Sequence, residues 1–206
     1  MTSSEERAAR RGVLTVGALA VLLLGLGFWQ LGGTGWIYAK AGVAQALLER
    51  AWATRLADGR TLRPWPGAET HPVARLRVPT LDVDLLVLTG TSERTLALGP
   101  GHIEGTVAPG EAGHSILTGH RDTHFGFLEN LERGTLLWVQ RADGIWRRFR
   151  VTGRDVFDSR KAQLAPGSGW PVLSLVADWP AEKAGATTPW RYVVTAEAVT
   201  EVALRD

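Results

Sequence analysis

Two histidines, an arginine and an aspartate lie close together in the stretch Leu117–Phe125, directly after an apolar run. They are His120, Arg121, Asp122 and His124. Titratable groups gathered at the end of an expected strand are a usual place for chemistry. An imidazole gives or takes a proton near neutral pH, so one of these histidines is a candidate acid or base. A hydrogen-bonded structural histidine is the alternative, and this stretch alone does not decide between the two.

Two later stretches add to this pattern. Residues Pro171–Pro180 read Pro-Val-Leu-Ser-Leu-Val-Ala-Asp-Trp-Pro, and Pro189–Thr195 read Pro-Trp-Arg-Tyr-Val-Val-Thr. Together with Leu117–Phe125 they resemble the sortase family, over roughly residues 72–200. In that family a strand ending in Thr-Gly-His-Arg-Asp-Thr supplies the catalytic His, a strand like Thr-Leu-Val-Thr-Cys-Tyr-Pro supplies the nucleophilic Cys, and an Arg opens the last strand. The subgroup of Gram-negative bacteria is especially similar, also through Ala74–Pro79 and Gly99–Gly105.

The resemblance implies a role for several side chains. His120 matches the family's His, which protonates the departing amine, and Arg191 matches the Arg, which stabilises the developing oxyanion or holds the substrate. Asp178 falls where the Cys stands. Neighbouring residues are expected to line the substrate groove or support these three side chains: Thr118, Asp122, His124, Ala177 and Trp179. Asp122 is a candidate acceptor for a backbone amide in the loop after His120.

Asp178 limits how far the family's activity carries over, because the chain contains no cysteine. A thiolate attacks the peptide carbonyl and holds the acyl group. A carboxylate would form a mixed anhydride, far uphill of the amide, so transpeptidation through Asp178 is not expected. Three interpretations stay open. Asp178 pairs with His120 and Arg191 in a domain that binds peptide without cutting it, or it acts as general base for water, or the substitution is engineered or a neutral loss.

The function implied by the resemblance is recognition of a C-terminal sorting signal, similar to Leu-Pro-x-Thr-Gly, on a partner protein. Whether the chain is an enzyme stays open. One hypothesis is a sortase-type peptide hydrolase or transferase, and the other is a non-enzymatic periplasmic peptide-binding or adaptor domain. Carbohydrate binding through the tryptophans is less favoured, because four of them precede the expected domain: Trp29, Trp36, Trp52 and Trp65.

Composition and charge exclude several other classes of protein. The chain has 206 residues, 45% of them hydrophobic, which suits one medium-sized domain with an appendage. The formal net charge is only +2, and arginines are dispersed among carboxylates, so nucleic-acid binding is not expected. The sequence has no metal-ligand cysteine spacing, phosphate-binding glycine loop or internal repeat. No metal or cofactor is therefore expected.

The N-terminal part predicts a membrane anchor. Residues 1–11 are polar and include three arginines, and Gly12–Trp29 is a charge-free run of about eighteen residues, close to the length that spans a bilayer. We therefore predict a single-pass signal anchor over 12–31, with residues 1–11 in the cytoplasm and the domain outside the inner membrane, in the periplasm. A cleaved signal peptide, with Ala39-Lys40-Ala41 as its cleavage site, is the less favoured alternative.

Residues 32–57 follow as a predicted juxtamembrane helix, rich in helix formers, which stands between membrane and domain or packs onto the domain. Asp58-Gly59 ends it. The proline-rich segment 58–72 reads as an extended linker that Trp65 is expected to pin to the domain surface.

From residue 73 to 206 the pattern changes to short apolar or alternating runs broken by turn residues, which predicts a mainly β domain. Ser92–Leu98 and Phe125–Leu131 are expected short helices. The sortase resemblance implies that the strands close into an eight-stranded barrel, which the strand count alone does not require. The expected strands are Ala74–Val78, Val83–Leu88, His114–Thr118, Leu136–Gln140, Trp146–Thr152, Arg154–Phe157, Val172–Ala177 and Arg191–Ala198.

Overall fold

The computed structural model describes residues 40–161, 169–179 and 189–199. The predicted cytoplasmic segment 1–11, the predicted anchor 12–31 and residues 32–39 of the predicted juxtamembrane helix lie outside these residues. Among the residues that are described, no helix is both long and apolar enough to traverse a bilayer.

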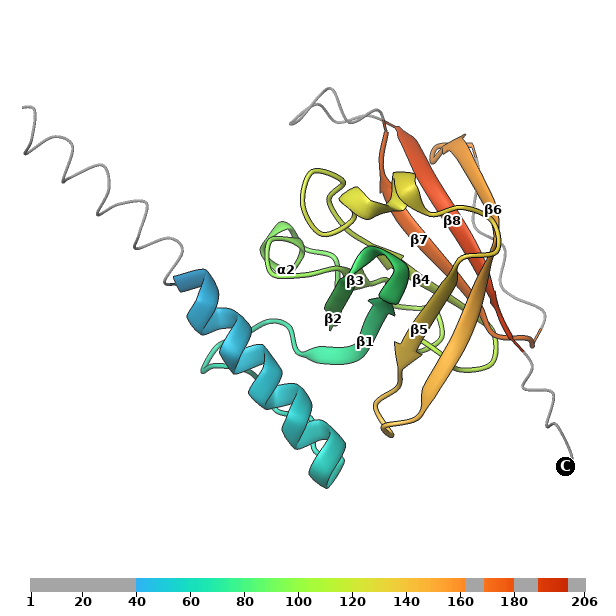
Figure 1. Ribbon diagram of the computed structural model, residues 1–206. Helices are drawn as coiled ribbons and strands as arrows, with labels where there is room; N and C mark the ends of the chain where they lie inside the picture. The colour runs from blue at the N-terminus through green and yellow to red at the C-terminus, as the bar shows by residue number, and fades with distance from the viewer. Residues whose placement is uncertain (1–39, 162–168, 180–188, 200–206) are drawn as a thin grey trace, which may run out of the picture. The chain divides into compact units, whose positions relative to one another are not determined.

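Eight strands in the described residues form a closed barrel in the order β1-β2-β3-β4-β7-β8-β6-β5 (Figure 1). The barrel confirms the predicted mainly β fold. Its strands are β1 (Pro72–Val78), β2 (Val83–Thr89), β3 (Gly101–His102), β4 (His114–Thr118), β5 (Leu136–Gln140), β6 (Trp146–Asp158), β7 (Val172–Asp178) and β8 (Trp190–Ala198). Three short helical pieces join them: η1 (Pro79–Leu81), α2 (Glu93–Leu96) and η2 (Gly126–Asn130).

Two details of the strand prediction were wrong. The segments expected at 146–152 and 154–157 form the single strand β6, which stays paired with β8 through a register shift between Val151 and Gly153. Such an irregularity bends a strand without ending it. The two-residue strand β3 was not expected, because it has no apolar alternation. It pairs in parallel with β2 and antiparallel with β4. The predicted helices at 92–98 and 125–131 are real but shorter.

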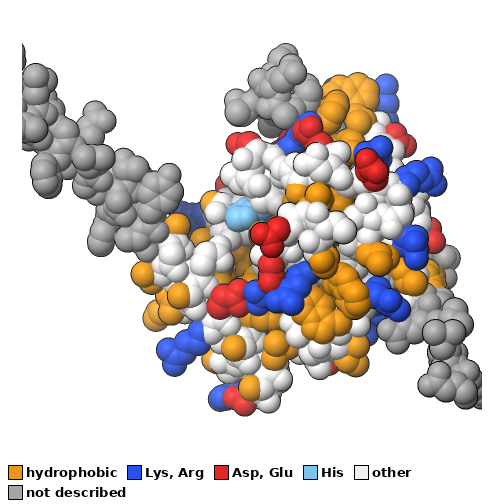
Figure 2. All heavy atoms as spheres, viewed as in Figure 1, with side chains coloured by type: hydrophobic (Ala, Val, Ile, Leu, Met, Phe, Trp, Pro, Cys, Tyr) orange, Lys and Arg blue, Asp and Glu red, His pale blue; other side chains and the backbone are white. Residues whose placement is uncertain are grey.

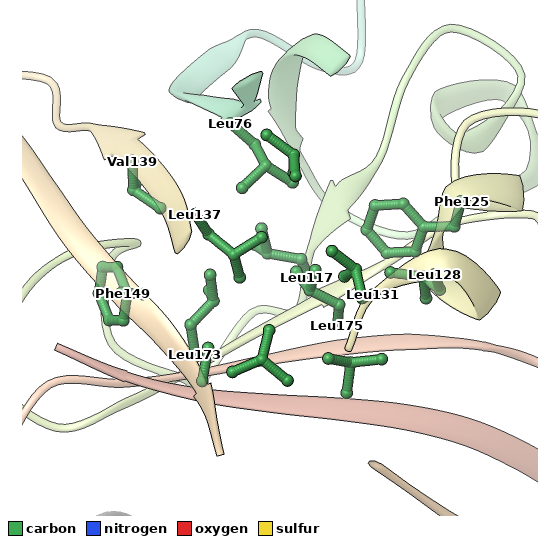
Figure 3. Close-up of a cluster of buried hydrophobic side chains, with 14 of the residues drawn as sticks. Leu76, Leu117, Phe125, Leu128, Leu131, Leu137, Val139, Phe149, Leu173 and Leu175 are labelled. Atoms are coloured by element: carbon green, nitrogen blue, oxygen red, sulfur yellow. The ribbon is translucent and has the colours of Figure 1, made fainter. Parts of the chain in front are cut away.

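The barrel interior is filled by large aliphatic and aromatic side chains from nearly every strand (Figure 3). Strand β7 is buried on both faces, because apolar side chains cover each of them. Leu173 and Leu175 point into the main core, whereas Val176 packs in a smaller cluster with Ile116 and Val193. Burying one such side chain contributes about 1.5–3 kcal/mol. The strands that carry the predicted site are therefore held in place by a buried apolar core.

A helix covers residues 40–58, and its part from residue 44 belongs to the same compact unit as the barrel. Leu48 and Trp52 pack against Leu86 and Leu88 of β2. The Trp52 indole N–H donates to the Gln140 side-chain oxygen at 3.3 Å. This helix therefore packs onto the domain, one of the two arrangements that the sequence left open. Residue Trp65 packs against the same cluster, as expected for the segment that follows.

The pairing of three neighbouring strands prepares the site. Strand β4 runs parallel to β7, and β7 runs antiparallel to β8. The C-terminal ends of β4 and β7 and the N-terminal end of β8 therefore meet at one edge of the barrel wall, where the three strands lie side by side (Figure 1). We call this edge the β4–β7–β8 edge.

Candidate functional site

The strand register brings the ends that carry the three predicted site residues together. Asp178 is the direct cross-strand partner of Arg191. On the other side of β7, Thr118 pairs with Val176, and the backbone N–H of Gly119 donates to the Val176 carbonyl at 3.2 Å. His120 follows at once. All three residues thus lie at the β4–β7–β8 edge, although they are far apart in the sequence.

Asp178 and Arg191 form an ion pair. The Arg191 guanidinium Nη1 lies 3.0 Å from Asp178 Oδ1, and the same nitrogen donates to the Trp190 carbonyl at 2.9 Å. The side chains are 53% exposed at Asp178 and 30% exposed at Arg191. Pairs this open to water contribute about 0–1 kcal/mol to stability. The pair therefore fixes the orientation of two groups at the surface more than it holds the barrel together.

His120 has a different partner. Its Nε2 lies 3.3 Å from Oε2 of Glu93, which comes from α2 and is 87% exposed. The sequence interpretation expected Asp178 to pair with both cations, but the structure pairs Asp178 with Arg191 and His120 with Glu93. Nothing in the sequence around Glu93 signalled this contact, because it depends on how the β2–β3 connection folds back.

The backbone after β4 explains the residues that surround His120. The amides of Thr123 and Phe125 both donate to the His120 carbonyl, which closes a tight turn. Phe125 is fully buried at the end of this turn. A Cβ atom at Gly119 would lie only 3.0–3.3 Å from atoms of the Phe125 ring, so any larger residue would require this buried ring to shift by a few tenths of an ångström. The turn thereby fixes where His120 leaves the wall.

The other predicted site residues differ in their exposure. Thr118 is half-buried at the end of β4, and Ala177 points into the main core, so its side chain does not face solvent. Asp122 is exposed, and within the described part of the chain no backbone amide donates to it. Burial lowers the pKa of His124, a hydrogen bond to the backbone of Ala97 raises it, and the charge of His120 lowers it further.

Trp179 joins two residues to which the sequence interpretation gave no role. Its ring stacks on Tyr192 with centroids 5.3 Å apart, and the Arg121 guanidinium carbon lies 4.1 Å from the centre of the Trp179 ring. Arg121 also forms an ion pair with Glu129 of η2. Arg121 and Tyr192 stand inside the quoted motifs, but their stacking becomes visible only in three dimensions.

The end of β6 borders the same edge, because Asp158 pairs with Trp190 across β6 and β8. Hydrogen bonds from the side chain and then the backbone of Arg160 lower the pKa of Asp158 to about 2. The amide and hydroxyl of Ser159 both donate to the Pro189 carbonyl at 2.8 Å. The chain entering β8 is therefore fixed to β6 just before Arg191.

On the face in Figure 2, the charged side chains do not gather into a patch of one sign. Acidic and basic side chains alternate with apolar ones on this face (Figure 2), in agreement with the dispersed arginines of the sequence. In residues 40–161, 169–179 and 189–199, no group of three or more His, Asp or Glu side chains could hold a metal ion. Among the ionisable side chains at the edge, His120 pairs with Glu93 and Arg191 pairs with Asp178.

A model of the sortase domain matches residues 76–199, from the last residues of β1 to the end of β8. The chain belongs to the sortase family. It is 28% identical over 125 residues to Sortase D of Bacillus subtilis, a match that covers 61% of this chain and 63% of that protein. It thus spans somewhat less than two thirds of this sortase.

Solved sortase structures are similar as well. Sortase C-1 of Actinomyces oris is 31% identical, with a TM-score of 0.55 over 63% of this chain and 75% of that one. A Sortase D5 transpeptidase of Clostridium perfringens has a TM-score of 0.61 over 77% of this chain and 99% of that one, at 17% identity. At 17% identity, the second structure supports only the barrel fold. The family model and the first structure are similar to this chain in sequence as well as in fold.

Proposed function

We propose that this sortase-family protein binds the C-terminal sorting signal of a partner protein, similar to Leu-Pro-x-Thr-Gly, along the β4–β7–β8 edge without transferring it. The observation that supports the proposal is the Asp178–Arg191 ion pair at the end of β7. By the motif match alone, this carboxylate corresponds to the family's cysteine. We further propose that the chain belongs to the subgroup from Gram-negative bacteria, which the quoted motifs resemble.

The chemistry of the edge favours binding over transfer. Acyl transfer requires a nucleophile whose acyl adduct persists until an amine arrives, and a carboxylate forms an anhydride that water destroys. Arg191 and His120 nevertheless keep donor groups suited to peptide carbonyls. A guanidinium has five N–H donors, so Arg191 can hold Asp178 and still donate to a bound peptide. The named relatives are sortases, which supports a peptide as the ligand class.

The test measures binding and cleavage in the same sample. A fluorescent peptide containing the Leu-Pro-x-Thr-Gly signal is titrated with the purified chain, its anisotropy is followed, and products are sought by mass spectrometry. We expect saturable binding, no cleavage, and no saturation with a scrambled peptide. The substitution Arg191→Ala should weaken binding by about tenfold, a loss of roughly 1.4 kcal/mol. Arg133→Ala, at an exposed arginine of the loop before β5, is the matched control.

Two outcomes would contradict the proposal. Equal binding of the scrambled peptide would remove recognition of the signal. Steady release of two peptide fragments would contradict binding without cleavage. It would favour the alternative that the protein is a hydrolase in which Asp178 acts as general base. Loss of that release in Asp178→Asn would then identify the base.

We also propose that residues 12–31 anchor the protein in the inner membrane, with residues 1–11 in the cytoplasm and the barrel in the periplasm. The charge-free run and its flanking arginines support this. Since the chain contains no cysteine, single thiols can report the topology. In spheroplasts, a membrane-impermeant maleimide should label Glu132→Cys, on the exposed surface, but label Ser3→Cys only after lysis. The reverse pattern would contradict the orientation.

A further inference from the structure

Arg121 is buried at the edge to an extent that is unusual for arginine. Its side chain is 8% exposed, and its guanidinium lies 4.1 Å from the centre of the Trp179 ring. Glu129 is its ion-pair partner, but Nε and Nη1 have no hydrogen-bond partner in the described part of the protein. Buried N–H groups without acceptors cost free energy. The contact with Trp179 and the pair with Glu129 therefore have to offset that cost.

The stacked residues have a simple relation to the predicted site. Arg121 follows His120, Trp179 follows Asp178, and Tyr192 follows Arg191. Within a strand, successive side chains point to opposite faces. Tyr192 accordingly packs against the main core, while its predecessor Arg191 reaches the Asp178 carboxylate. Each side chain of the predicted site thus has a chain neighbour in one stack of Arg121, Trp179 and Tyr192.

We propose that this stack is a positioning device that sets the spacing between His120, position 178 and Arg191. It joins the ends of three strands by side-chain contact, next to the backbone bonds from the Gly119 amide to Val176 and from the Trp179 amide to Trp190. The planar guanidinium is suited to this role, because it lies flat on an indole ring and pairs with a carboxylate at once, which a lysine ammonium does not. The inference deepens the proposed function and depends on it.

The test introduces a thiol as a distance-sensitive reporter. In the variant Asp178→Cys, the rate of alkylation by iodoacetamide is measured against pH. Proximity to His120 and Arg191 should lower the midpoint below the ordinary thiol value of about 8.5. Adding Arg121→Ala should raise the midpoint by about one pH unit, so that alkylation at pH 7 slows by about tenfold. Adding Arg133→Ala should leave the midpoint unchanged.

A second substitution separates position from charge. Removing Arg121 also removes a cation near the thiol, whereas Trp179→Leu breaks the same contact and leaves every charge in place. We expect Trp179→Leu to raise the midpoint too. The double variant should raise it little further, because both changes break one contact. Circular dichroism of each variant checks that the barrel is retained.

The outcomes distinguish the two proposals. An ordinary midpoint in Asp178→Cys alone would contradict the proposed site itself. A lowered midpoint that survives both Arg121→Ala and Trp179→Leu would overturn the positioning role and leave the peptide-binding proposal standing. A midpoint that responds to Arg121→Ala but not to Trp179→Leu would reduce Arg121 to a nearby charge and likewise overturn the positioning role.

Discussion

The two ends of strand β4 each carry a histidine, and the two histidines have different surroundings. His114 begins the strand, and its Nε2 lies 2.8 Å from the hydroxyl of Ser174, which is fully buried in β7. His120 follows the end of the strand, is 29% exposed, and meets the exposed carboxylate of Glu93. The same β4–β7 pair thus has a closed polar contact at one end and an open, charged edge at the other.

The difference teaches that residue type alone does not identify a site. A serine and a histidine in hydrogen-bond contact suggest a nucleophile and its base. At Ser174, however, no substrate atom can approach, because the residue is inside the wall. The open edge has the weaker contacts, yet its side chains are accessible. The following experiments test this contrast.

The largest effect on stability is expected in the middle of β7, at Leu175. This residue is 0% exposed in the main core, so Leu175→Ala should leave a cavity and lower the free energy of unfolding by about 2–5 kcal/mol. Urea unfolding measures it. Leu62→Ala, at a leucine that is 40% exposed, should change it by less than about 0.5 kcal/mol. A similar loss in both variants would contradict the core described here.

Thiol reactivity compares the ends directly. Asp178→Cys should place a thiol at the open edge, whereas Ser174→Cys should place one inside the wall beside His114. Iodoacetamide should react at least about 100-fold faster with the first, because the second reacts only after local opening of the barrel. Mass spectrometry of the intact protein follows both. Equal rates would remove the contrast.

The two histidines should differ in their contribution to stability. His114→Ala leaves the Ser174 hydroxyl buried without its partner, so the free energy of unfolding should fall by about 1–3 kcal/mol. His120→Ala should change it by less than about 0.5 kcal/mol but weaken peptide binding. Adding Ser174→Ala to His114→Ala should recover part of the loss, since no hydroxyl is then left unpaired. The reverse ranking would contradict our assignment of roles.

The smallest effect concerns pH. Burial lowers the pKa of His124, and burial also lowers that of His102 although a hydrogen bond to Val107 opposes it. The folded protein therefore favours the neutral rings, and the unfolded chain takes up protons first as pH falls. Stability should be full above about pH 6.5 and decrease below it. The Tm between pH 7.5 and 5 measures this, and replacing both residues with Gln should flatten the slope.

Sequence reasoning reached the strand ends but not the contacts across them. Apolar runs that end just before His120 and Asp178, and one that follows Arg191, predicted the strands, and the family pattern predicted that those strand ends meet. The short strand β3 was missed, since two residues carry no periodicity. The bulge at Gly153 was taken for a break, because glycine reads as a turn in a strand pattern.

Side-chain partners were the least predictable part of the site. Glu93 reaches His120 only because α2 folds back onto the loop after β4, and no spacing in the sequence encodes that approach. Arg121 was visible in its motif, but its burial and its contact with Trp179 depend on three strand ends at once. Local sequence patterns predict the strands, whereas the contacts of Glu93 and Arg121 depend on the pairing of strands that are far apart in the sequence.

The parallel pairing of β4 with β7 also affects how the protein is made. The two strands are distant in the sequence, and the wall closes only when β8 joins β6 to β7. Long-range pairing of this kind forms slowly, and until it forms the strand edges stay open to other chains. A nascent polypeptide that ends before β7 therefore has neither a closed wall nor the β4–β7–β8 edge, and it depends on protection from aggregation until β7 and β8 are made.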